Sequence, residues 1–184
     1  RMSNKQIGWS NESNLLWAIG KQIGLLTNLL GSLYEGSLPK ANGAFFDSQD
    51  QSATINVNTP MLFRNTSMSN SVFIQSDDTI KVTREGDYNI AFSAQFLKTT
   101  GGVHSVTIWL KKNGVAIPNT GTRVTIPSSG SYIVAAWNFF EHLTPSDDLK
   151  LIWRQDDAIV MKHVDATVDY PAIPSVILTV NQVN

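Results

Sequence analysis

The sequence predicts an all-β sandwich that is preceded in the chain by one helix. From residue 43 onward, apolar and polar residues alternate in short runs separated by turn residues, which is typical of strands with one buried face. Before that point, in Ser13–Leu33 (SNLLWAIGKQIGLLTNLLGSL), apolar residues recur every three and four positions, as in an amphipathic helix. We therefore expect a helical stalk or anchor with its linker at residues 1–40 and a β-sandwich head at residues 41–184.

The helical segment carries two apolar rows at heptad spacing. The rows are Leu16, Ile23 and Leu30 in one core position and Ile19, Leu26 and Leu33 in the other. Gly20, Gly24 and Gly31 interrupt the segment, and each costs about 1 kcal/mol relative to alanine in a helix interior. An isolated helix of this length is already marginal in water. The segment is therefore expected to associate with partners, and Leu and Ile in both core positions are compatible with a three-stranded coiled coil.

Individual strands can be placed in the second segment. The clearest is Asp87–Lys98, where large apolar residues occupy even-numbered positions and mostly polar residues occupy odd-numbered ones. Asn113-Gly114 favours a tight hairpin after Ser105–Lys112, because both residues tolerate a positive φ. Further strands are expected at 53–57, 61–64, 72–75, 79–83, 115–117, 123–126, 132–142, 149–154, 159–163 and 175–183.

One expected strand, Tyr132–His142, is apolar on both of its faces. A sandwich core covers only one of them, so the other face requires a loop of the same chain or a second copy of the chain. Trp109, which is out of phase with the apolar positions of its own strand, raises the same question. For Trp109 or for the second face of Tyr132–His142 taken alone, coverage by a loop of the same chain is nearly as good an explanation as a subunit interface. Together with the heptad rows, these strands favour a subunit interface that uses Trp109, Trp137 and Phe139.

Composition and charge exclude several classes of protein. Lys and Arg total 14 against 15 Asp and Glu, and no basic block extends beyond Lys111-Lys112, so a nucleic-acid partner is not expected. The chain has no cysteine, which excludes disulfides and thiolate metal sites. Polar residues such as Asn14, Lys21 and Gln22 interrupt the apolar helix, so no membrane span is predicted.

No pattern typical of an enzyme is found. His104, His142 and His163 lie far apart without a second ligand at metal-binding spacing, and the chain has neither a Gly-x-Ser-x-Gly elbow nor a cysteine nucleophile. We therefore expect no catalytic site and no cofactor. Adjacent acids at 77–78, 147–148 and 156–157 offer oxygen ligands of the kind that calcium binds, but solvated turns are the stronger interpretation because no twelve-residue calcium loop is present.

Four segments follow one another in a characteristic order. They are REGDYNIAFSAQF, SVTIWLKKNG, GSYIVAAWNFFEHLTPSDDLKLIW and IPSVILTVNQV. The first contains Gly86-x-Tyr88, and the second ends in Lys-Asn-Gly at 112–114. The third contains Asp147-Asp148, where the family named in the next sentence usually has Gly-Asp, and the proline which that family usually has shortly before Gly86 is missing. Over residues 43–183 this order resembles the C1q-like domain of the C1q and tumour necrosis factor (TNF) superfamily. The resemblance implies a ten-stranded jelly roll that assembles as a tight homotrimer, often behind a trimerising stalk.

The short helix and the Ser-, Thr- and Asn-rich head also resemble C1q-like structural proteins of tailed bacteriophages. This resemblance implies a non-enzymatic virion protein, made in the host cytoplasm, whose partners are its own copies and capsid, neck or tail proteins. A capsid decoration or head fibre is favoured, with Leu15, Leu25 and Leu29 docking the helix onto the particle. The alternatives are a tail-associated receptor-binding protein and a secreted C1q- or TNF-like ligand. In the tail role, Asn65–Ser71 and Asp165–Tyr170 are candidates for binding a host glycan or receptor.

Overall fold

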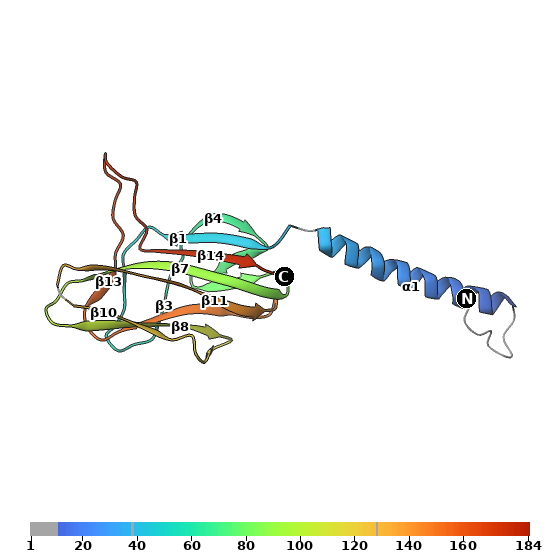
Figure 1. Ribbon diagram of the computed structural model, residues 1–184, viewed down its shortest axis with the longest axis horizontal. Coiled ribbons are helices and arrows are strands. Elements are labelled where there is room, and N and C mark those ends of the chain that lie inside the picture. Colours follow the sequence, from blue (N-terminus) through green and yellow to red (C-terminus); the bar gives the residue numbers. More distant parts are fainter. Residues whose placement is uncertain (1–10, 38, 128) are drawn as a thin grey trace. The chain divides into compact units, whose positions relative to one another are not determined.

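The computed structural model describes residues 11–37, 39–127 and 129–184, which form one helix and two β-sheets (Figure 1). Within the helix, the side chains of residues 13 and 15–31 are described. The chain divides into two compact units, Arg1–Pro39 and Lys40–Asn184. The second unit, here named the head, contains both sheets.

Helix α1 spans Asn11–Ser37 and confirms the predicted helix. It ends two residues before Pro39, a residue type that cannot continue a helix. The described leucine and isoleucine side chains of α1 are all exposed; Leu16, for example, retains 70% of its accessible surface. Among the described residues, no helix combines the length and the hydropathy that a membrane crossing requires.

The first sheet of the head, named the front sheet, has the strand order β2-β13-β7-β14-β1-β4, and β11 pairs with β7 from the other side. Its strands are β1 (Asn42–Asp47), β2 (Gln51–Ser52), β4 (Asn65–Asn70), β7 (Gly86–Lys98), β11 (Tyr132–Leu143), β13 (Ile159–Met161) and β14 (Val176–Gln182). All of these pairings are antiparallel.

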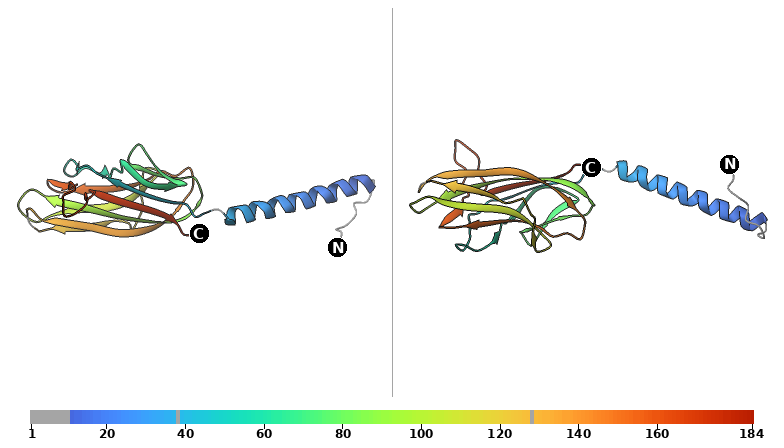
Figure 2. Two further views of the ribbon diagram at one scale, coloured as in Figure 1. Left: turned by 90° about the horizontal axis from the view of Figure 1, so that it is seen from above. Right: turned by 60° about the horizontal axis from the view of Figure 1, so that its bottom comes forward.

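The second sheet, named the back sheet, has the order β10-β8-β12-β6-β5, with β3 on β12 and β9 on β8. Its strands are β3 (Thr59–Pro60), β5 (Val72–Gln75), β6 (Thr79–Val82), β8 (His104–Lys112), β9 (Val115–Ala116), β10 (Thr122–Ile126) and β12 (Leu149–Gln155). The two sheets form the two layers of a sandwich (Figure 2). The described residues form 14 strands, whereas the resemblance implied ten; the two-residue strands β2 and β3 are among those that the alternation did not predict.

The core of the head lies between the two sheets. Strand β7 alternates as predicted, and its even-numbered side chains from Tyr88 to Lys98 are buried. The back sheet contributes Ile108 and Trp153, and the ring of Trp153 lies 5.7 Å from that of Phe96 on β7. Because burial of a large apolar side chain is worth about 1.5–3 kcal/mol, this shared interior holds the two sheets together.

Two turns and one edge strand can be compared with the local structure that the sequence predicted. The predicted hairpin at Asn113-Gly114 is confirmed: both residues have positive φ, 51° and 83°, and β9 returns beside Lys111 and Lys112. The strand expected at 53–57 is instead a turn in which Asn56 has φ 62°. The polar segment Asn65–Asn70, which is not among the strands expected from the sequence, forms edge strand β4 because it pairs with β1.

Candidate functional site

The outward side of the front sheet carries an apolar surface, here named the front face. Its large apolar side chains include Phe46, Met68, Tyr132, Val134, Phe140 and Ile177. Strand pairing places Phe46 beside Ile177 and Ser93 beside Ala136, so that one row of the face crosses β1, β14, β7 and β11. Phe140 retains 64% of its accessible surface, although phenylalanine is among the side chains most often found inside proteins.

The front face has almost no charge. Among the described outward residues of β1, β7, β11 and β14, the acidic and basic side chains are Asp87 and His142, which are paired with each other where β7 begins. Scattered exposed apolar residues are ordinary on a protein surface, but depletion of charge is the compositional mark of the buried centre of a protein interface. The front face therefore has the composition of a surface that another protein covers.

His142 and its neighbours mark the charged end of this face. His142 Nδ1 lies 2.8 Å from Asp87 Oδ1, and His142 Nε2 lies 3.4 Å from Glu85 Oε1. The hydrogen bond to Asp87 raises the pKa of His142 above its ordinary value of 6.5. The same bond lowers the pKa of Asp87, which also accepts a hydrogen bond from the amide of Asn184. This cluster joins β7, β11 and the last residue of the chain by charge-assisted bonds.

Trp137 and Phe139, which we predicted at an interface, face the core. Their rings lie 4.6 and 6.1 Å from that of Phe92. The reason is register: Trp137 pairs directly with Phe92, and directly paired residues of antiparallel strands point to the same side of the sheet. Use of β11 in an interface stays a prediction, but the structure offers the even-numbered set for it, including Tyr132, Val134 and Phe140.

The opposite polarity of the two sets could have been recognised in the sequence. The even-numbered positions of β11 include Asn138 and His142, which are exposed in the structure, whereas the odd-numbered positions from 133 to 139 are wholly apolar. A core tolerates unpaired polar groups poorly. The wholly apolar set was therefore the better candidate for the core.

The heptad positions of α1 form a second uncovered surface, here named the heptad stripe. Its described members are Leu16, Ile19, Ile23, Leu26 and Leu30, all exposed. Leu33 belongs to the backbone of α1, but its side chain lies outside the described ones. Leu15, Leu25 and Leu29, off the stripe, are exposed as well. Within the described part of the chain nothing covers these side chains, so their association remains a prediction.

The outward side of the back sheet, the back face, is charged. It carries five basic side chains: Lys81, Lys111, Arg123, Lys150 and Arg154. Two of them form ion pairs with acidic residues: Lys150 Nζ lies 2.8 Å from Asp78 Oδ2, and Lys81 pairs closely with Asp148. The back face thus keeps an excess of positive charge although the whole chain has a formal net charge of −1.

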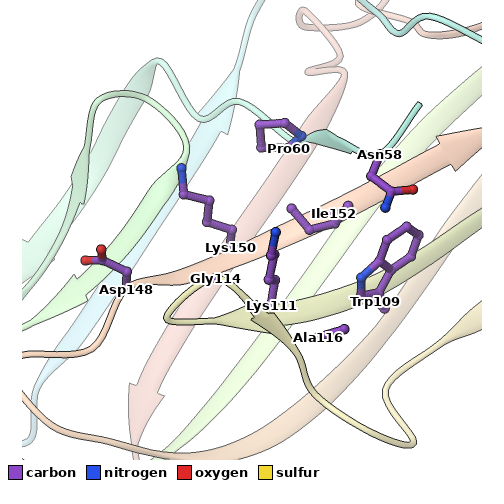
Figure 3. A pocket seen from close by; sticks show the side chains of 9 residues that line it. All are labelled: Asn58, Pro60, Trp109, Lys111, Gly114, Ala116, Asp148, Lys150 and Ile152. Atoms are coloured by element: carbon purple, nitrogen blue, oxygen red, sulfur yellow. The ribbon is translucent and has the colours of Figure 1, made fainter.

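Trp109, the third predicted interface residue, lies in a hollow on the back face (Figure 3). The hollow has a volume of about 600 Å³, and its lining includes Pro60, Trp109, Lys111, Lys150 and Ile152. Asn58, Gly114, Ala116 and Asp148 complete it. Trp109 is half-buried there and pairs with Ile152 of β12. The structure brings Trp109 together with two lysines rather than with Trp137, which belongs to the other sheet.

The remaining candidate residues do not form a common site. His104 lies between Asp156 and Asp157, at 3.3 and 3.1 Å, and His163 lies 3.2 Å from Asp165. Among the residues that the structure describes, no cluster of three His, Asp or Glu is arranged to hold a metal ion. The three acid pairs considered for calcium instead supply ion pairs and hydrogen bonds within the head, such as that from Asn113 to Asp147.

Of the two candidate ligand loops, one is a projecting hairpin. The segment 164–173 stands out from the sandwich and is closed by a bridge between Val164 and Ile173 (Figure 1). Val168 at its tip is fully exposed, and Tyr170 is also exposed. The other candidate, Asn65–Ser71, consists of β4 and the residue after it. A host-binding role for either segment remains a prediction.

The sheet order and the core define the head as an antiparallel jelly-roll β-sandwich of the TNF and C1q type, which confirms the predicted fold. Solved structures with this fold include the following three. Eiger, a TNF from S. frugiperda, is 10% identical over 80% of this chain and 94% of its own, with TM-score 0.54. The globular domain of zebrafish complement 1qA protein is 11% identical over 79% and 98%, with TM-score 0.50. Murine APRIL is 12% identical over 79% and 100%, with TM-score 0.52.

These identities are low, so the similarity establishes the fold and not the activity. No protein-family model and no curated protein sequence matches the chain.

Proposed function

We propose that the chain is a non-catalytic assembly module in which three copies associate through their front faces and their α1 helices. One observation carries the proposal: a single chain leaves two large apolar surfaces uncovered, the front face, which is charged at one end only, and the heptad stripe. Apolar surface of this kind is stabilised when a partner removes it from water. Self-association is the simplest explanation, because a second copy of the chain supplies a matching partner for both surfaces.

Three copies are favoured over two by the two parts of the chain separately. The heptad positions mix Leu and Ile in both core positions, which is compatible with three helices. The head has the fold of the TNF and C1q domains, for which the sequence resemblance implied a homotrimer.

The decisive test is the mass of the full chain in solution. Sedimentation velocity at micromolar concentration should give a species three times the 20.3 kDa of one chain. A monodisperse monomer would overturn the proposal. A stable dimer would keep self-association but contradict the three-fold arrangement.

The setting that we propose for this trimer is the virion of a tailed phage, as a capsid decoration or head fibre that docks through α1. Leu15, Leu25 and Leu29 support this placement, because they are exposed apolar side chains outside the heptad stripe. Leu25 lies away from the seam of a three-helix bundle, and Leu15 and Leu29 flank it. A helix with a second apolar surface is suited to bind a further protein, here a capsid protein. A tail-associated adhesin is the variant in which α1 anchors the trimer at the tail and the head meets the host.

The competing setting is a secreted TNF- or C1q-like ligand, which the fold of Eiger, APRIL and complement 1qA favours. Electron microscopy of particles from the source, labelled with an antibody against residues 43–184, separates these settings. Label over the capsid supports the decoration role, and label confined to the tail supports the adhesin. Absence of label from every particle would overturn the virion setting and favour the secreted ligand.

A further inference from the structure

The hollow on the back face combines an aromatic floor with unbalanced charge. Strands β8 and β12 are paired so that Trp109 lies beside Ile152 and Lys111 lies beside Lys150. Figure 3 shows these four side chains on the same side of the two strands. Pro60, paired with Ile152, extends the apolar floor beyond β12, and Ala116, paired with Lys111, extends it beyond β8.

The charge of the hollow is unbalanced at Lys111. Two lysines directly opposite each other on neighbouring strands repel and destabilise a sheet. Lys150 is compensated because its Nζ donates to Asp78 at 2.8 Å, and Asp148 is engaged by Lys81. Lys111 makes no ion pair or hydrogen bond through its ammonium group with any described residue, although it lies across from another cation. The hollow therefore holds one ammonium without a partner above an aromatic floor.

The rim of the hollow supplies hydrogen-bonding groups. Asn58 Oδ1 accepts a hydrogen bond from Arg154 at 3.5 Å, whereas its amide nitrogen has no partner among the described residues. Arg154, which lies outside the lining of the hollow, also donates to Asn56 at 3.2 Å, so its guanidinium is engaged by two asparagine side chains. A few polar groups around an apolar floor are the usual composition of a small-ligand site, and a volume near 600 Å³ is within the usual range for one.

We infer that this hollow binds an acidic saccharide, with one sugar ring over Trp109 and its carboxylate at the Lys111 ammonium. A pyranose ring has a face of C–H groups that an indole and an aliphatic floor can cover, hydroxyls that Asn58 can bind, and, in an acidic sugar, one carboxylate. One unpaired ammonium matches one carboxylate by a charge-assisted hydrogen bond. A polyphosphate or an RNA strand would call for several free cations in the lining, and Lys111 is the single uncompensated one among the described lining residues.

The site lies on the back sheet, whereas the proposed trimer interface lies on the front sheet. Binding at the hollow and assembly at the front face are therefore tested separately, and a result that contradicts one proposal does not contradict the other.

The test uses the full chain with sialyllactose and galacturonic acid oligomers as probes. Lactose and the methyl esters of the galacturonic acid oligomers are the matched neutral controls. Saturation-transfer NMR should show contact to the ring protons of the acidic sugars, and titration calorimetry should show weaker or absent binding of the neutral ones. Raising the salt concentration should lower the affinity, because the ammonium of Lys111 is accessible to counterions.

Two variants locate the site. Lys111→Gln should lower the affinity for the acidic probe by about tenfold or more, since it removes a charge-assisted hydrogen bond. Trp109→Ala should abolish the transfer signal of the sugar ring. Thr125→Ala, an exposed position of β10 outside the hollow lining, should change neither, and thermal melting should show that all three variants fold.

Three results would overturn the inference. The first is no binding of any acidic saccharide at millimolar concentration. The second is equal binding by the chain and its Trp109→Ala variant. The third is tighter binding of a short oligothymidylate that depends on the same two residues, which would assign the hollow to single-stranded nucleic acid instead.

Discussion

The front and back faces of the head differ in charge although both sheets bury one side in the same core. The front face carries many large apolar side chains and, among the described outward residues of β1, β7, β11 and β14, acidic and basic groups at one end only. The back face carries five Lys and Arg side chains, and two of them form ion pairs with aspartates. The core does not require this difference, since it is built from the opposite sides of the same strands. The difference shows which side of the sandwich is suited to burial and which is suited to water and polar ligands.

The largest expected effect follows from placing a charge on the front face. Phe140→Asp should convert the trimer into monomers at micromolar concentration. Each copy loses an apolar contact worth about 1.5–3 kcal/mol, and the new carboxylate would have to be buried without a partner. Because Phe140 is exposed in the single chain, the head itself should still fold. Sedimentation velocity measures the mass, and circular dichroism checks the fold.

The matched control places the same charge on the back sheet. Thr125→Asp, on exposed β10, should remain trimeric. A trimeric Phe140→Asp variant, or a monomeric Thr125→Asp variant, would contradict the assignment of the front face as the interface.

The next effect concerns the heptad stripe, which resembles the front face in being apolar and uncovered. Ile23→Asp should reduce the helical signal in far-ultraviolet circular dichroism, because a helix with three interior glycines depends on burial of this stripe. The loss is about 1.5–3 kcal/mol in each chain. Asn28→Asp, at the heptad position farthest from the stripe, is the control and should keep the helix. Equal helicity in both variants would show that α1 does not associate through the stripe.

Much of this comparison was readable in the sequence. Alternation along β7 predicted which side chains are buried, and Asn113-Gly114 predicted the hairpin, because both signals are local. The heptad rows predicted α1 for the same reason. The general fold followed from the order of several such elements, which the jelly-roll structure confirms.

The parts that sequence reasoning missed depend on strand pairing. Strand β11 is apolar on both faces, and its pairing with β7 decides that Trp137 is inside and Phe140 is outside. The hollow at Trp109 also requires β12 to pair with both β8 and β3, and neither of these long-range pairings has a local signal, unlike the β8–β9 hairpin. Strand β4 is polar and owes its conformation to β1.

A smaller effect on the stability of the head is expected at Lys111, whose positive charge on the back face is not paired with a described acidic residue. Lys111→Thr should stabilise the head by about 0.2–1 kcal/mol, because it removes a lysine directly opposite Lys150. Urea unfolding measures the gain, which should shrink at high salt as the repulsion is screened. The neighbouring Lys112 is the control: its Nζ donates to the carbonyl of His142, so Lys112→Thr should not stabilise. A gain for Lys111→Thr that is insensitive to salt would mean that repulsion is not its cause.

The smallest effect comes from the charged end of the front face. Because the pKa of His142 is raised in the folded head by its bond to Asp87, its stabilising contribution is complete below the ordinary value of 6.5 and is lost as the pH rises through the raised value. The free energy of unfolding should therefore fall with increasing pH in that window, and His142→Gln should flatten this slope. Asp87→Asn removes the main partner and should flatten the slope in part, because Glu85 remains beside His142 and also raises its pKa. A slope that survives unchanged in His142→Gln would assign the pH dependence to another group and leave His142 without a role in stability.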